Sequence, residues 1–143
     1  MAIKQSDWAY GRRVAAVGDE AGDVICERYS YVITSDLAAG DIIEMGPLPA
    51  FTFPVDAILV TDELVDSTID AGIMSGEFGS SNQSRTCGAE LFSAAADASV
   101  VRMSLRGGFR LTPVDKDRGI GVKVSAAITA ANQRIDLLLY YRQ

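Results

Sequence analysis

The sequence predicts an all-β fold: an antiparallel β-sandwich or jelly roll of about eight short strands, with an extended N-terminal arm. Apolar and polar residues alternate with a period of two in several segments, most clearly over the last 25 or so residues. Turn-forming residues separate these segments at intervals of roughly 8–14 residues. Helical segments do not alternate with the strands, so a βαβ fold is not expected.

The length and composition indicate one globular unit. The chain has 143 residues, of which 48% are hydrophobic and 22% charged. A chain of this length removes roughly two-thirds of its unfolded surface from water, so neither a disulfide nor a metal is needed for stability. We divide it into an extended arm, residues 1–22, and a β-sandwich domain, residues 23–143.

The arm is charged and rich in glycine, and it has few large apolar residues. Two of these are the aromatic residues Trp8 and Tyr10, which Arg12 and Arg13 follow. The arm either folds back on its own domain or lies on a neighbouring subunit. Aromatic and arginine side chains are enriched at binding hot spots. We therefore take Trp8, Tyr10, Arg12 and Arg13 as the candidate partner interface.

The first strands are expected from about residue 24. Ile25, Tyr29, Tyr31 and Ile33 share one face, with Glu27 intruding, while Arg28 and Ser30 lie on the other. Prolines and glycines end several later segments, because proline fixes φ and lacks a backbone donor. Further strands are expected near residues 42–45, 51–53, 55–61, 68–73, 100–105 and 109–111.

Two segments between the strands have a different character. Residues 76–88 are polar and rich in glycine and serine, which predicts a long loop. Residues 89–98 are rich in alanine and form the only plausible helix, although so short a helix needs packing to be stable.

The C-terminal alternation is the strongest signal. Every second residue from Ile120 to Ile128 is apolar or small, and the same holds from Ile135 to Tyr141. A turn at residues 130–133 separates the two segments. We expect them to pair with each other, to close the sandwich and to belong to the core.

The charged and polar residues give little support to catalysis. The chain has no histidine, the commonest general base and zinc ligand. Its net charge of −6 disfavours binding to nucleic acid. We therefore expect that the protein is not an enzyme and that it has no catalytic residues, metal or cofactor. We also expect neither a signal peptide nor a membrane span.

Several local patterns have ordinary structural explanations. Ser75 directly precedes Gly76, so the spacing is not that of a nucleophile elbow. Asp62, Glu63, Asp66 and Asp70 could supply oxygen ligands to calcium, but they lack the ligand spacing of an EF-hand and suit a solvated acidic turn. Arginines 102, 106 and 110 suit charged strand edges that deter aggregation. Cys26 and Cys87 are most simply two buried thiols, although a disulfide between them stays open.

A run of phrases from about residue 32 to 142 resembles the small capsid decoration, or cement, proteins of tailed bacteriophages. The phrases are Val32–Glu44, Gly46–Pro49, Val55–Val60, Gly72–Gly76, Asp117–Val122 and Tyr140–Arg142. Residues 1–22 lie outside the resemblance.

The resemblance implies a non-enzymatic protein of the virion. Such a protein would be made in the host cytoplasm and would bind the outer surface of an icosahedral capsid. Its partner would be the phage major capsid protein, whose subunits it would bridge. Self-association as a dimer or trimer at capsid symmetry axes is also implied. From the charge and composition we expect neither nucleic acid nor membrane as a partner.

Two other functions stay open from the residues themselves. One is a carbohydrate-binding or receptor-binding β-sandwich of a phage tail or fibre, although such sites usually expose several aromatic residues on one face. The other is a hydrolase that uses carboxylates, which would need paired acids with perturbed pKa values in a cleft.

Overall fold

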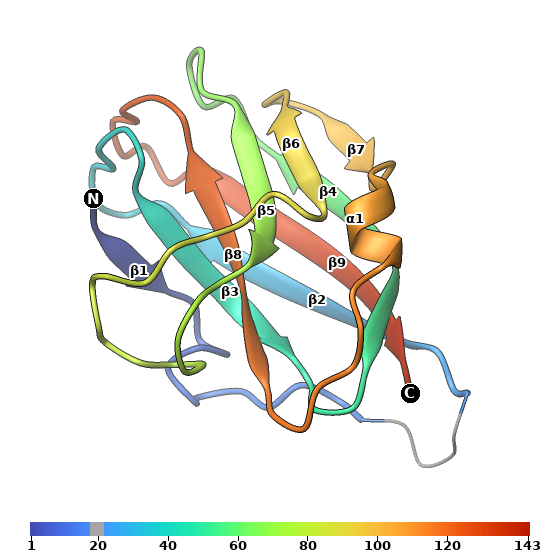
Figure 1. The fold of residues 1–143 in the computed structure, drawn as a ribbon. Coiled ribbons are helices and arrows are strands. Elements are labelled where there is room, and N and C mark those ends of the chain that lie inside the picture. The colour runs from blue at the N-terminus through green and yellow to red at the C-terminus, as the bar shows by residue number, and fades with distance from the viewer. Residues whose placement is uncertain (18–21) are drawn as a thin grey trace.

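The predicted fold class is confirmed by a computed structural model, which describes residues 1–17 and 22–143. These residues form nine strands in two sheets packed face to face, with one short helix (Figure 1). Sheet A consists, in spatial order, of β1 (Ile3–Gln5), β3 (Ile42–Leu48), β8 (Arg118–Val124), β5 (Ile69–Ile73) and β6 (Phe92–Ala95). Sheet B consists of β2 (Ile25–Val32), β9 (Arg134–Arg142), β4 (Phe53–Thr61) and β7 (Val100–Arg102).

The core lies between the two sheets and is built from the alternating faces expected from the sequence. In β9 the buried residues are every second one, Ile135, Leu137, Leu139 and Tyr141. In β8 they include Ile120, Val122 and Val124, which belong to the same apolar cluster. Because side chains alternate across a strand, the intervening residues of β9 lie on the outer face of sheet B.

One expected pairing is wrong. The two C-terminal segments do not pair with each other: β8 pairs with β3 and β5 in sheet A, whereas β9 pairs with β2 and β4 in sheet B. Residues 125–133 carry the chain from one sheet to the other. The two apolar faces therefore oppose each other across the core, and alternation alone could not distinguish this arrangement from a hairpin.

The expected helix at residues 89–98 is also wrong. Phe92–Ala95 forms β6, which pairs with β5 through Ile69 and Ala71, so sheet pairing overrides the helix preference of the alanines. The single α-helix of the described residues, α1, is Arg106–Phe109, where the sequence predicts a turn and the start of a strand.

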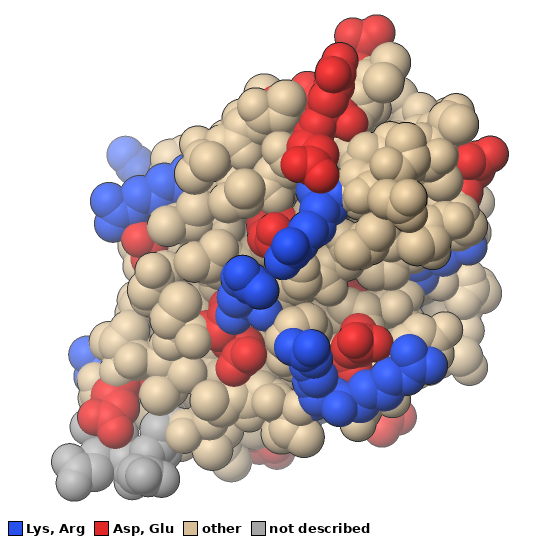
Figure 2. All heavy atoms as spheres, turned by 180° about the vertical axis from the view of Figure 1, so that it is seen from behind, with Lys and Arg blue, Asp and Glu red and all other residues tan. Residues whose placement is uncertain are grey.

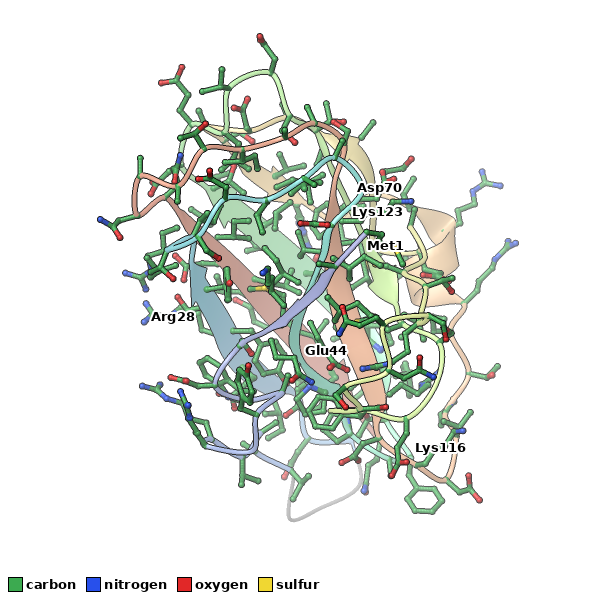
Figure 3. The ribbon with its side chains drawn as sticks, turned by 90° about the vertical axis from the view of Figure 1, so that its left-hand side faces the viewer. Met1, Arg28, Glu44, Asp70, Lys116 and Lys123 are labelled. Atoms are coloured by element: carbon green, nitrogen blue, oxygen red, sulfur yellow. The ribbon has the colours of Figure 1, made fainter. Side chains whose placement is uncertain are left out.

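The outer face of sheet A is covered by residues 75–91. The guanidinium of Arg85 reaches through this loop to the carboxylate of Glu44 on β3, and both side chains are almost fully buried. Ile3, Ile42 and Met74 form a small apolar cluster on the same side. Figure 3 shows Glu44 inside the molecule, beneath this loop.

The outer face of sheet B is open to solvent. Figure 2 looks onto this face and shows Lys and Arg side chains running down its middle, with acidic side chains beside them. Cys26 lies on this face and is exposed, while Cys87 is half-buried on the side of sheet A, and both thiols are free. The expectation that both cysteines are buried is therefore wrong for Cys26.

The sheet edges differ in length. The edge strands of sheet A are β1, with three residues, and β6, with four, and β7 at one edge of sheet B has three. The other edge of sheet B is β2, which has eight residues. No helix among the described residues is long and apolar enough to cross a membrane.

Candidate functional site

The N-terminal segment is attached to both sheets. Its first residues form β1, which pairs in parallel with the start of β3, Ile3 opposite Ile42. The backbone N–H of Ala2 donates to the Asp41 carboxylate at 2.6 Å, and the backbone N–H of Ser6 donates to the carbonyl of Glu44 at 2.9 Å. The segment after β1 is therefore held at a defined place beside the sandwich.

Trp8 anchors the segment in the core. It is 6% exposed and packs edge-on against Tyr29 of β2, with ring centroids 5.3 Å apart. The Tyr29 hydroxyl in turn donates to the carbonyl of Pro47 at 2.7 Å. A Cβ on Gly46 would meet the Tyr29 ring at 2.5 Å, so the ring can occupy this place only because residue 46 is glycine.

The two arginines after Trp8 lie over aromatic rings. The Arg13 guanidinium lies 5.0 Å from the centroid of the Trp8 ring, and that of Arg12 lies 5.1 Å from the centroid of Tyr10. Arg12 also pairs with Asp7 at 3.3 Å, but both side chains are exposed, so this ion pair adds little stability. The rings fix the approximate positions of two cations at the surface.

Beside these arginines lies a groove of about 630 Å³, which we call the β2 groove. One wall is the N-terminal segment and the other is β2 together with Arg134 of β9. Its lining residues are Gln5, Ser6, Asp7, Trp8, Arg12, Arg13, Glu27, Arg28, Ser30, Tyr31, Val32, Thr34 and Arg134.

The β2 groove is basic although the chain as a whole is acidic. Four arginines line it against two carboxylates, Asp7 and Glu27, whereas the net charge of the chain is −6. The Glu27 carboxylate accepts a hydrogen bond from the backbone N–H of Ala16 at 3.1 Å. Arg28 makes no ion pair or side-chain hydrogen bond with the described residues, and Figure 3 shows it extending away from the sandwich.

The backbone along this groove is available for pairing. Ile33 exchanges backbone hydrogen bonds with Gln133 and Asn132, on the side of β9. Since backbone groups alternate in direction along an antiparallel strand, the N–H and C=O groups of Arg28, Ser30 and Val32 point away from β9. No strand of the described chain pairs with β2 on that side.

The structure separates the four predicted interface residues into two kinds. Trp8 is buried, while Tyr10, Arg12 and Arg13 are exposed around it. Trp8, Arg12 and Arg13 all line the β2 groove. Their contact with a partner stays a prediction, as does the division of the chain at residue 22.

Two further residues of the groove were missed by the sequence analysis. Arg28 was placed only on the polar face of its strand, and Arg134 was not singled out. The sequence separates them from Arg12 and Arg13 by 15 residues or more, and β2 can be recognised as an edge only once the sheet order is known. No local pattern in the sequence signals this combination.

The described residues offer little other chemistry. They contain no group of three or more cysteine, aspartate or glutamate side chains placed to hold a metal ion. Glu44 and Arg85 form the one buried ion pair among them. The Arg85 guanidinium also donates hydrogen bonds to carbonyls of the 75–91 loop, so this pair leaves no charge free to bind a ligand. A second hollow, of about 580 Å³, is lined by Gly76, Glu77, Phe78, Lys116 and Asp117, which lie in two surface loops.

Comparison with known proteins gives a match over the whole chain. A chain in the structure of the capsid of Ralstonia phage GP4 is 42% identical, covers 99% of this chain and 98% of its own length, and superimposes with a TM-score of 0.92. A chain of the cyanophage Pam1 capsid asymmetric unit is 21% identical over 91% of this chain and 92% of its own length. Its TM-score of 0.58 shows a similar fold.

No protein-family model and no curated protein sequence matches the chain. The GP4 match nonetheless shows the family, because the identity is 42% and the match covers nearly the full length of both chains. The chain therefore belongs to a family of phage capsid proteins, the one represented by that chain of the Ralstonia phage GP4 capsid.

Proposed function

We propose that this protein is a decoration protein, which binds the outer surface of an icosahedral phage shell and bridges subunits of the major capsid protein. The observation that carries the proposal is the match over almost the full length of both chains to a component of the GP4 capsid. The role within the shell is our inference from the small size of the chain, 143 residues in one sandwich, and from the resemblance of its sequence to decoration proteins.

The binding free energy of each copy would be modest, but the sum over the many copies on one shell would be large. A contact between a protein of 15.2 kDa and a shell need bury only a standard-sized interface. Many copies that each bridge two subunits then add to the free energy needed to separate those subunits. We further propose that the protein associates as a dimer or trimer at capsid symmetry axes.

The proposal can be tested with closed shells assembled from the major capsid protein of the same phage. The purified protein is added after the shells have closed, so that it can reach only their outer surface, and bound protein is separated by sedimentation. We expect saturable binding and a rise in the temperature at which the shells disassemble. Failure to co-sediment would contradict the proposal.

A second experiment separates decoration from shell formation. The protein is expressed alone and its mass is measured by light scattering. A decoration protein should remain a monomer or small oligomer. If the chain alone assembled into shells, it would be a shell-forming subunit, and the decoration role would be wrong.

The carbohydrate-binding alternative has no specific observation in its favour. The single tryptophan of the chain, Trp8, lies in the core beneath Arg13 and cannot stack on a sugar there. Tyr10 is exposed, but it lies on the N-terminal segment beside Arg12, and among the described residues no second exposed aromatic ring contacts it.

A further inference from the structure

The most unusual feature of the surface is the long edge of sheet B. A free edge strand displays unpaired N–H and C=O groups and tends to pair with other chains, so proteins commonly shorten, cover or charge their edges. Three of the four edges described above follow this rule, with strands of three or four residues. The β2 edge does not: it has eight residues and opens into a groove.

The groove supplies what an added strand would need on both sides. The backbone groups of Arg28, Ser30 and Val32 face it and could form the ladder of hydrogen bonds, while the N-terminal segment forms the opposite wall. Recognition by strand addition derives affinity from such main-chain bonds and specificity from the side chains alongside.

The charges indicate what kind of segment would fit. Arg12 and Arg13 lie on one wall, and Arg28 and Arg134 lie on the other. Two of the four already have carboxylate partners, Arg12 with Asp7 and Arg134 with Asp136, whereas Arg13 has only the Trp8 ring and Arg28 has no partner among the described residues. An incoming chain with carboxylates would satisfy these two guanidinium groups, and a basic chain would be repelled.

We propose that the β2 groove binds an extended, acidic segment of the shell protein, which adds to sheet B as a strand beside β2. This inference rests on the proposed function, because it names the surface through which the decoration protein would hold the shell. It also gives the four predicted interface residues distinct roles. Trp8 positions the wall, Arg12 and Arg13 present charge, and Tyr10 supports Arg12.

The charge component can be tested by shell binding. Arg28→Glu reverses the guanidinium that has no internal partner, so it should leave folding unchanged and weaken binding to closed shells about tenfold or more. Arg110→Glu is the matched control, since Arg110 is an exposed arginine just after α1 and lies outside the groove. This control should bind as the unmodified protein does.

The backbone component needs a separate variant. Val32→Pro removes an N–H group that points into the groove, and proline is tolerated on a free strand edge. Cys26→Pro makes the same change on the same edge outside the groove lining. Circular dichroism checks that both variants fold. Val32→Pro should weaken shell binding about tenfold, and Cys26→Pro should not.

The outcomes distinguish the two proposals. If the unmodified protein binds shells and neither Arg28→Glu nor Val32→Pro weakens the binding, the groove proposal is wrong and the decoration role stands. If the unmodified protein does not bind shells, both are wrong. If the two variants instead change the mass of the free protein in light scattering, the groove holds a second copy of this chain, and the shell segment is excluded as its occupant.

A peptide provides a direct measurement without shells. A fluorescent peptide of alternating Glu and Thr should bind the unmodified protein, lose affinity with rising salt and lose it also with Arg28→Glu. A peptide of alternating Lys and Thr should not bind. Equal binding of the two peptides would overturn the assignment of an acidic occupant.

Discussion

The guanidinium of Arg85 lies directly on the carboxylate of Glu44, with Nη2 to Oε1 at 2.6 Å and Nη1 to Oε2 at 2.9 Å. The two side chains are 2% and 0% exposed. Arg85 also donates to the carbonyls of Ser75 and Ser80, so its charge is satisfied wholly within the protein. This ion pair joins a polar loop to the middle of sheet A.

Glu44→Gln should destabilise the fold by about 3–5 kcal/mol, because it leaves the Arg85 charge buried without a counter-charge. Urea unfolding followed by circular dichroism measures the loss. Asp7→Asn removes the exposed pair with Arg12 and should cost less than about 1 kcal/mol. Equal losses in the two variants would mean that burial of the Glu44 pair has no energetic effect.

Trp8→Ala should destabilise the fold by about 3–5 kcal/mol, since it empties a large buried site against Tyr29. Tyr10→Ala is the control: the side chain is 61% exposed two residues away and should cost about 0.5 kcal/mol or less. Circular dichroism during thermal unfolding suits both variants, because the first removes the only tryptophan. Similar melting temperatures for the two would contradict the anchoring role of Trp8.

Stability should fall steeply as the pH rises above about 10. Burial raises the pKa of Tyr29 and of Tyr141 in the folded protein, and neighbouring acidic groups add to the effect. A raised folded pKa means that these hydroxyls keep their protons while the unfolded chain loses them, so stability is intact below the unfolded pKa and is lost above it.

Absorbance at 295 nm checks this directly. The buried hydroxyls should ionise only as the protein unfolds, in one cooperative step. Tyr29→Phe loses the hydrogen bond to Pro47, which costs about 1 kcal/mol near neutral pH, and should show a shallower loss at high pH. Gradual ionisation of all five tyrosines without unfolding would refute the prediction.

The two thiols should differ sharply toward an aromatic disulfide reagent at pH 8. Cys26 is exposed on sheet B and should react at once. Burial raises the pKa of Cys87 to about 12, so almost none of it is the reactive thiolate at that pH. One rapid equivalent is expected, and it should disappear in Cys26→Ser. Two rapid equivalents would show that the 75–91 loop opens readily.

The sequence was sufficient to identify most strands because each has one face in the core. The alternation over β9 assigned Leu137 and Leu139 to the interior correctly. Alternation fixes a face but not a partner, which is why the pairing of β8 with β9 was wrong. The alanines near residue 94 illustrate the opposite failure, since their local helix preference is overridden by pairing with β5.

The candidate site could be predicted only in part, for the same reason. Trp8, Arg12 and Arg13 stand close together in the chain and were recognisable by residue type. Arg28 and Arg134 join them only because β2 and β9 are neighbours at one side of sheet B. Since β2 has a partner on one side alone, its importance depends on sheet order, a property of the whole fold.

The unequal sheet edges limit how this protein can polymerise. Fibres built by strand pairing require two long edges in each molecule, one to give and one to receive. Among the described residues, β2 is the only edge strand longer than four residues. Each molecule can therefore form one such strand pairing and no more. Two copies joined through β2 would use up both long edges and end the growth. The protein can therefore reach a high concentration without polymerising into fibres through its strand edges.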